Sequence, residues 1–547
     1  MLWDYIVVGA GLCGSVLVHE LLEKDPDLKI LVIEAGINAN DRQDIVWPNS
    51  TNGQGGDFDW SYASVPQTHL NGRSIPSNAG KGLGGGTLIN GAAWVRGHSV
   101  DYDLWAKAVG DERWSYEGLL PYMKQTESFF TQDTDKGQHG FEGNMKVQSI
   151  SSLNRTFPMR KPLIESWEEL GISPAPDFDH NRGNPMGIGE MQENRNHGRR
   201  QQSSLVFPID KATVLTETLV QKVITQKSPK GQVVAQGVQL ANGTQIRGKE
   251  VILSAGAYRT PQILMLSGLG PKEQLQKHGI KVQLDLPKVG QNLHDHAVFV
   301  TAWGLKDPSK GWAVESGNPL FKQPQYGLGL YLDFVTTVDV PKDGLAKAIE
   351  KDTGKKPNPK THPLLNQERA MATHTIQYAG ASQDGSAVIS MTVLVIDQSR
   401  GQISLSSSKI KDAPLINANF MGTEVDRYAM REAVKHDIKL LTSNKTIVGR
   451  EIISGELGDK PLTTASTDEE IDARIRAGLT GIFHPMGTAA MGRVVDKDLK
   501  VLGVQNLRVV DASIIPQSIS GNIQVVLYAT ALQAAEIIGK KIETVEH

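Results

Sequence analysis

A glycine turn at the extreme N-terminus constrains this chain more than any other feature. Apolar residues 5–8 predict a strand, the turn Gly9-Ala10-Gly11-Leu12-Cys13-Gly14 follows, and residues 15–22 carry apolar side chains at helical spacing. A second predicted strand, residues 29–33, ends directly before Glu34, which lies 20 positions beyond the last glycine of the turn. Strand, glycine turn, helix, strand and acid in this order predict a βαβ unit of an α/β domain.

The three glycines and the acid have separate physical roles in such a unit. Gly9 permits the tight turn, Gly11 lets the backbone approach a pyrophosphate, and Gly14 lets helix and strand pack closely. Glu34 is placed to accept hydrogen bonds from adenosine ribose hydroxyls. The alternative is a purely structural glycine turn, which the second strand and the spacing of the acid argue against. We therefore predict that this unit binds a dinucleotide.

Length and composition narrow the class of protein. The chain has 547 residues, more than a single hydrophobic core usually holds, so two substructures are expected. Its formal net charge of -3 provides no basic surface that would attract nucleic acid. No segment approaches the roughly 18 consecutive apolar residues of a membrane-spanning helix. We therefore expect a soluble protein with neither nucleic-acid nor membrane partners.

The sequence leaves the compartment open. The N-terminus begins directly in a predicted strand, yet a signal peptide removed before residue 1 would leave the same sequence. The single cysteine, Cys13, excludes an intramolecular disulfide and fits a cytoplasmic protein as well as a secreted one.

A second glycine-rich stretch spans residues 80–91, with the sequence GKGLGGGTLING. So many glycines prevent a stable helix or strand, and the apolar Leu83, Leu88 and Ile89 argue against a flexible surface linker. We interpret the stretch as backbone wrapped closely over a flat ligand, with Asn90 offering its side-chain amide.

Further strands are predicted along the chain. Residues 214–224 and 237–240 alternate like half-buried strands, and residues 250–254 indicate a return to the nucleotide-binding domain. Residues 387–396 form an apolar run typical of a buried strand in the other domain. The polar, lysine-rich residues 342–363 are interpreted as a surface excursion.

Two polar residues stand out near the C-terminus. His484 lies between apolar neighbours, and Asn522 precedes an apolar segment that favours a helix. Taken alone, each has a simpler interpretation: a core histidine with satisfied hydrogen bonds, and the N-cap of the helix.

With these pieces in order, the chain resembles the glucose-methanol-choline oxidoreductases along essentially its full length. The matching segments are the N-terminal βαβ unit with Glu34, residues 80–91, residues 256–270, the VGQNLHDH sequence of residues 289–296, Phe483-His484-Pro485 with Gly487-Thr488, and residues 507–516 followed by Asn522. The resemblance implies a mixed α/β fold in which a Rossmann-like FAD-binding domain is interleaved with a sheet-based substrate-binding domain. We assign residues 1–40, 75–105, 205–300 and 480–547 to the FAD-binding domain, residues 41–74 to a connection that covers the flavin, and residues 106–204 and 301–479 to the substrate-binding domain.

The resemblance also implies the roles of single residues. His484 and Asn522 would be the catalytic pair, with His484 accepting the hydroxyl proton and Asn522 hydrogen-bonding the substrate oxygen. The helix that begins near Asn522 would direct its positive end at the pyrimidine side of the flavin. The isoalloxazine would be lined by Asn90, Gly91 and Ala92, while Val220 would meet the adenine and Asp511 the pyrophosphate or ribityl chain. The complete set implied for FAD binding is Gly9, Gly11, Leu12, Gly14, Glu34, Ala35, Asn90, Gly91, Ala92, Val220, Asp511, Ala512 and Ile523.

The expected activity is oxidation of an alcohol with hydride transfer to flavin N5, followed by reoxidation by oxygen or a quinone-type acceptor. Residues 84–90 contain no histidine, whereas family members with covalent flavin often carry one there, so we expect non-covalent FAD. Thr480 stands where glucose-oxidising members carry an arginine, which disfavours glucose. Ile482 and Phe483 suit an aryl, aliphatic or secondary-metabolite alcohol, while the glycine loop resembles that of the sugar-oxidising branch. Both substrate classes stay open.

Other functions are compatible with the same scaffold. Hydroxynitrile lyases and a ring-closing cyclase resemble this family without net redox turnover, and a flavin-binding protein without catalysis is a third alternative. His294 and His296 alternate along the chain and could suggest a metal site, but one pair of histidines is not a site, and we expect no metal.

Overall fold

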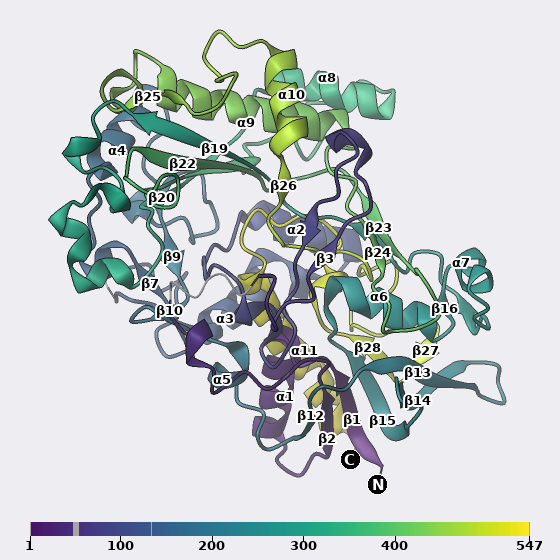
Figure 1. Ribbon diagram of the computed structural model, residues 1–547. Helices are drawn as coiled ribbons and strands as arrows, with labels where there is room; N and C mark the ends of the chain where they lie inside the picture. The colour runs from purple at the N-terminus through teal and green to yellow at the C-terminus, as the bar shows by residue number, and fades with distance from the viewer. Residues whose placement is uncertain (1, 48–53, 133, 546–547) are drawn as a thin grey trace.

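The computed structural model describes residues 2–47, 54–132 and 134–545 (Figure 1). Two large sheets dominate these residues, one of eight strands near the chain termini and one of seven strands at the other end of the molecule. The expected mixed α/β fold is confirmed. Part of the predicted flavin-covering connection, residues 48–53, lies outside the described residues.

The eight-stranded sheet contains the predicted βαβ unit. Its order is β12-β2-β1-β15-β14-β13, with β28 beside β15 and β27 beside β14. Strands β12, β2, β1, β15 and β28 run parallel to one another. The bounds are β1 Trp3–Val8, β2 Ile30–Ile33, β12 Thr213–Leu215, β13 Val220–Lys227, β14 Val233–Leu240, β15 Gln245–Leu253, β27 Val504–Gln505 and β28 Leu507–Val509.

Helices α1 (Leu12–Lys24) and α11 (Gln524–Val545) lie side by side next to this sheet, although they are at opposite ends of the sequence (Figure 1). Their apolar faces bury Val16, Leu17 and Ala531 completely. This pairing brings the start of α11, and with it Asn522, to the glycine turn that begins α1.

The seven-stranded sheet is antiparallel throughout, in the order β25-β19-β22-β21-β20-β8 with β26 beside β19. Helix α9 (Glu424–Thr442) packs against β21, β22 and β25. The bounds are β8 Gly187–Glu190, β19 Ala297–Leu305, β20 Phe334–Val338, β21 Ala372–Gln377, β22 Ala387–Leu394, β25 Ile453–Glu456 and β26 Thr480–Gly481.

The remaining α-helices are shorter than α11 and α9. They are α2 Ser99–Val109, α3 Tyr116–Thr126, α4 Arg160–Glu169, α5 Ser203–Val206, α6 Gly256–Leu266, α7 Lys272–Lys277, α8 Lys342–Thr353 and α10 Asp468–Gly478. Throughout the described ranges, every helix is too short or too polar to cross a membrane.

Two local predictions differ from the structure. The first half of the predicted surface excursion is helix α8, which buries Leu345 and Ile349 against α9. The lysines around Leu345 and Ile349 obscured the pattern, although a spacing of four residues between apolar side chains is typical of a helix. Helix α11 begins at Gln524, so Asn522 lies two residues before the helix rather than at its cap.

Candidate active site

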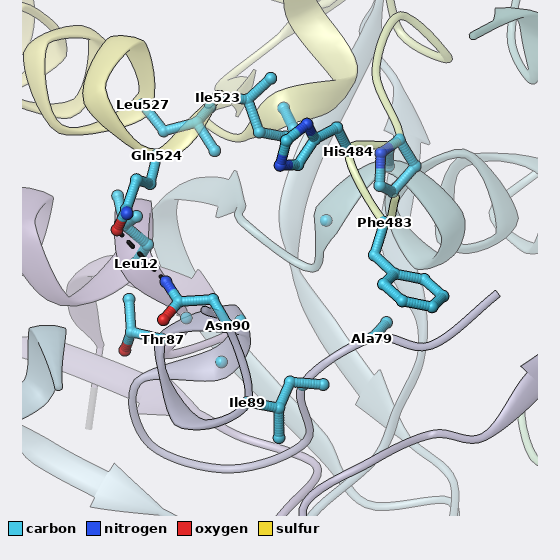
Figure 2. A pocket seen from close by; sticks show the side chains of 18 of the residues that line it. Leu12, Ala79, Thr87, Ile89, Asn90, Phe483, His484, Ile523, Gln524 and Leu527 are labelled. Carbon is cyan, nitrogen blue, oxygen red and sulfur yellow. Dashed lines mark hydrogen bonds between the residues drawn. The ribbon is translucent and has the colours of Figure 1, made fainter. Parts of the chain in front are cut away.

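A cavity of about 560 Å³ lies between the two sheets. It is lined by all of the predicted site residues except Gly14. Figure 2 shows part of it, with Asn90 and Ile89 on one side, Ile523 and Leu527 at the start of α11 and just before it on another, and His484 and Phe483 on a third. The fold therefore brings segments more than four hundred residues apart in sequence to one site.

The glycine turn is tightly packed at two of its three glycines. A Cβ on Gly14 would lie 2.1 Å from the Gly9 carbonyl oxygen, and a Cβ on Gly9, which has φ +103°, would lie 2.3 Å from the Ser254 carbonyl oxygen. Gly14 thus acts from behind the cavity by letting α1 approach β1. Helix α1 has no side-chain N-cap, so its first amides remain available to an anion such as a pyrophosphate.

The carboxylate of Glu34 lines the cavity and also braces the turn. Its Oε2 accepts from the Ala10 amide at 2.9 Å, and its Oε1 accepts from the Gly36 amide at 2.8 Å. Burial raises its pKa. Because each carboxylate oxygen has a second lone pair, these bonds leave Glu34 able to accept from ribose hydroxyls.

Asp511 joins two segments on the side of the cavity that contains the glycine turn. Its Oδ2 accepts from the Gly256 amide at 2.9 Å and from Thr260 Oγ1 at 2.6 Å, while Oδ1 accepts from the Ser513 amide at 2.8 Å. Burial raises the pKa of this carboxyl as well. Asp511 thereby holds the start of α6 against the segment that follows β28.

The second glycine stretch packs directly on the first. A Cβ on Gly85 would lie 2.7 Å from Gly11 Cα, and the Gly84 amide donates to the Ala10 carbonyl at 2.8 Å. By contrast, a Cβ on Gly86 or Gly91, which line the cavity, would meet no protein atom within 4 Å. The two stretches form a continuous backbone cradle with open space on one side, which fits a flat dinucleotide such as FAD.

Arg200 holds the second stretch in place and was missed by the sequence analysis. Its Nη1 donates to the Asn90 carbonyl at 2.6 Å and to Asn90 Oδ1 at 2.8 Å, while Nε donates to the Ile45 carbonyl at 2.9 Å. Burial lowers its pKa to about 9. Nothing in the sequence near Arg200 marks it, because its partners lie more than a hundred residues away.

The side chain of Asn90 is already engaged within the protein. Its Nδ2 donates to Gln524 Oε1 at 3.2 Å, the bond drawn as a dashed line in Figure 2, and its Oδ1 accepts from Arg200. Gln524 in turn donates to the Ala93 carbonyl at 2.6 Å. Asn90 lines the cavity as predicted, but its amide ties the glycine loop to the start of α11.

His484 is held in position by the segment that contains Asp295. The backbone amide of His484 donates to Asp295 Oδ1 at 2.7 Å, and the preceding residue, Phe483, has φ +64°. The imidazole is partly exposed to the cavity but lies deep in the protein, and this burial lowers its pKa to about 4. The ring is therefore neutral near pH 7 and able to accept a proton.

A second histidine contacts the first. Nδ1 of His484 lies 3.0 Å from Nδ1 of His296, and two neutral rings can share only one proton across this contact. Burial and the two neighbouring histidines lower the pKa of His296 well below its usual value, so this ring is neutral as well. When His484 Nδ1 is the donor and His296 Nδ1 the acceptor, Nε2 of His484 carries no proton and is available as a base.

Asn522 reaches the cavity from a tightly held loop. Its backbone amide donates to the Val95 carbonyl at 2.9 Å. Two residues earlier, the Ser520 amide and hydroxyl both donate to Asp101 Oδ2, at 2.9 and 2.5 Å. Arg369 pairs with the other oxygen of Asp101 at 2.6 Å. The loop is thus fixed to the N-terminal turn of α2.

The histidine pair that could have suggested a metal has other partners. His294 Nδ1 bonds the Asn292 carbonyl at 2.8 Å, and His296 contacts His484. No group of three or more metal-ligating side chains occurs among the residues the structure describes.

Comparison with known proteins agrees with this architecture. Two family models described as GMC oxidoreductase match residues 3–298 and 397–531. The GMC-type oxidoreductase acuG of Aspergillus aculeatus is 36% identical over 98% of this chain and 99% of its own length. An alcohol dehydrogenase (acceptor) of Pseudomonas putida is 32% identical over 99% and 96%.

Solved structures show the same fold. Formate oxidase of Aspergillus oryzae RIB40, a structure concerned with FAD modification, matches with a TM-score of 0.85 at 26% identity and covers 99% of both chains. Pyridoxine 4-oxidase of Mesorbium loti matches with a TM-score of 0.81 at 25% identity over 98% of both. The family models together match more than half of the chain, the relatives span nearly all of it, and the protein belongs to the GMC oxidoreductase family.

Proposed function

We propose that the protein oxidises an alcohol to a carbonyl compound, with His484 as the base that takes the hydroxyl proton. The observation that carries this proposal is the neutral imidazole of His484, which lines the cavity that also holds the dinucleotide cradle. The cofactor is FAD, as in the formate oxidase structure, and the cradle of residues 9–14 and 80–91 fits its pyrophosphate and flat ring. The lack of a histidine in residues 84–90 supports non-covalent binding.

The residues of this chain divide the chemistry between them. His484 Nε2 removes the hydroxyl proton while the carbinol carbon releases a hydride, so the alcohol loses two electrons and two hydrogens in total. Bound FAD supplies the hydride acceptor. Asn522 hydrogen-bonds the substrate oxygen. His296 accepts a hydrogen bond from His484 Nδ1 and keeps the His484 ring oriented. The start of α11 places its positive end beside the cavity, which favours negative charge there.

We also propose a division of the chain between cofactor and substrate. Residues 1–40, 75–105, 205–300 and 480–547 would hold the cofactor, and residues 106–204 and 301–479 the substrate. The electron acceptor that completes the cycle is oxygen or a quinone-type compound, and the relatives named as a dehydrogenase and as oxidases support both.

The test is an anaerobic titration of the purified yellow protein with sugars, aryl alcohols, aliphatic alcohols and choline. Bleaching of the flavin absorbance by one class is expected, and the rate of recovery in air separates an oxidase from a dehydrogenase. A holoprotein that photoreduces normally but is bleached by none of these alcohols would favour a non-redox lyase or cyclase instead.

A further inference from the structure

A row of polar side chains follows strand β21 across the floor of the cavity. Thr373, Thr375 and Gln377 all line the cavity, because alternate residues of a strand point to the same face. Successive members of the row are about 6.7 Å apart along the strand. His374 and Ile376 face the other way, where they line a small separate hollow.

Strand pairing fixes the direction of this row relative to the catalytic histidine. Ala297 pairs with Gly481, just before His484, and also with Leu394 at the end of β22. Thr373 pairs with Val393, the residue of β22 next to Leu394, and Thr375 pairs with Met391, two residues further along β22. Thr375 therefore lies one step of about 6.7 Å beyond Thr373, on the side away from His484.

The surroundings of the row are apolar. Val298, Val393 and Val395 form one hydrophobic cluster with Met391 and Ile482 packed against it. On the other flank, the cavity is lined by Leu330, Leu332 and Val335. A ligand that lies along β21 thus meets hydrocarbon on both sides and polar groups only along the strand itself.

Thr375 is the member of the row whose side-chain hydroxyl is both buried and unsatisfied. Its side chain is 7% exposed, and its Oγ1 is buried with no hydrogen-bond partner among the described residues. A hydroxyl buried in this way costs free energy unless a ligand satisfies it. Its position on the cavity floor makes the substrate the natural partner.

The same half of the cavity carries no fixed charge. Among the described residues, the acids and arginine that line the cavity are Glu34, Asp511 and Arg259, all on the side of the eight-stranded sheet. Each already has protein partners: backbone amides for both acids, and Tyr62 and Gln262 for Arg259. A cationic or anionic group lying along β21 would lose its hydration without meeting an opposite charge.

We infer that the substrate is an uncharged alcohol with a largely apolar body, and that a hydrogen-bonding oxygen at the end remote from its carbinol pairs with Thr375. This inference rests on the proposed function and adds the class of substrate to it. Thr375 is then a specificity-determining residue, because an analogue without the distal oxygen leaves its hydroxyl unpaired.

The test compares matched alcohols in the holoenzyme. Benzyl and 4-hydroxybenzyl alcohol form one pair, and cinnamyl and 4-hydroxycinnamyl alcohol form a longer one. For at least one pair, the wild-type protein is expected to favour the hydroxylated member, and Thr375→Val should lower that preference by about 10-fold. Comparing the ratio of the two alcohols between variants cancels their different intrinsic reactivities.

Thr336→Val is the matched control. Thr336 is also buried, on the neighbouring strand β20, but it faces the small hollow on the opposite side of the sheet, so its replacement should leave the preference unchanged. Binding is measured separately by anaerobic calorimetric titration of the same alcohols into His484→Ala holoenzyme, in which oxidation is slow, and into the double variant His484→Ala/Thr375→Val. Equal preference in these two proteins by titration would overturn the inference. Absence of flavin reduction in the wild type, with the binding preference intact, would overturn only the proposed function.

Discussion

At the scale of single residues, His484 carries the proposed chemistry. Replacing it with alanine should leave FAD bound and lower the rate of flavin reduction by roughly 10²–10⁴-fold, the usual effect of losing a general base. Anaerobic stopped-flow absorbance measures this rate. Asn522→Ala should cost less, because it removes a hydrogen bond and not the proton acceptor. Unchanged reduction in His484→Ala would remove it as the base.

The pKa of His484 predicts how the reaction depends on pH. Burial lowers this pKa to about 4, and only the neutral ring can accept the hydroxyl proton. The rate of flavin reduction should therefore be level around neutral pH and fall as the pH drops toward about 4. A rate that instead halves near the ordinary histidine pKa of about 6.5 would contradict this assignment.

The contact between His296 and His484 predicts a positioning role for His296. His296→Ala removes the acceptor for the Nδ1 proton of His484, so a fraction of His484 should carry its proton on Nε2 and fail as a base. We expect a loss of up to about 10²-fold in flavin reduction, with KM little changed. His296→Gln, which can still accept a hydrogen bond, should recover part of the rate. Equal rates in the two variants would argue for a packing role only.

Sequence patterns identified most of the residues that line the site, but not the residues that hold them in position. The glycine turn, Glu34 and His484 lie in recognisable motifs, and they line one cavity. Arg200 and Gln524 gave no signal, since each acts through a partner distant in sequence. His296 was noted in the segment 289–296 and as half of a histidine pair, but its role beside His484 was not predicted, because their contact spans 188 positions.

At the scale of elements, a buried charge cluster joins β5 (Glu127–Ser128) to the loops around it. His139 donates from Nδ1 to Glu127 Oε1 and from Nε2 to Asp179 Oδ2, both at 2.8 Å, so both ring nitrogens carry protons. Burial opposes this charge, but the hydrogen bonds to Asp179 and Glu127 outweigh it and raise the pKa of His139. The same contact helps to lower the pKa of Asp179 to about 2 despite its burial.

Replacing His139 with glutamine should destabilise the protein by about 3 kcal/mol, because two buried carboxylates lose their shared cation. A raised histidine pKa stabilises the fold fully below about pH 6.5, and this contribution disappears as the pH rises through the folded-state pKa. The difference in unfolding free energy between wild type and variant should therefore shrink at alkaline pH. Denaturant unfolding across pH measures it, with exposed His197→Gln as the control. A difference that grows with pH would contradict the charged state of His139.

Elements were predictable where the pattern was strong. Strand β1 ends in an apolar run before the glycine turn, β2 is apolar throughout, and β22 is a largely apolar strand buried by its neighbours. Helix α8 was misread because it buries only three side chains among lysines and acids, so that composition concealed its periodicity. The order of strands in the seven-stranded sheet could not be derived, since β8 and β25 join it from positions more than two hundred residues apart.

At the scale of the whole molecule, one cavity is lined by residues from both sheets, so FAD should stabilise the entire fold. A ligand present at about 1,000 times its Kd adds roughly 4 kcal/mol to the unfolding free energy. Calorimetry of the holoprotein and of protein stripped of FAD should show a higher Tm with FAD. Gly85→Ala should shrink this increment, because the new Cβ would lie 2.7 Å from Gly11 Cα and would separate the two halves of the cradle. Gly327→Ala, at an exposed glycine where a Cβ meets no atom within 4 Å, should leave it unchanged, and equal increments in both variants would show that FAD does not depend on this close contact.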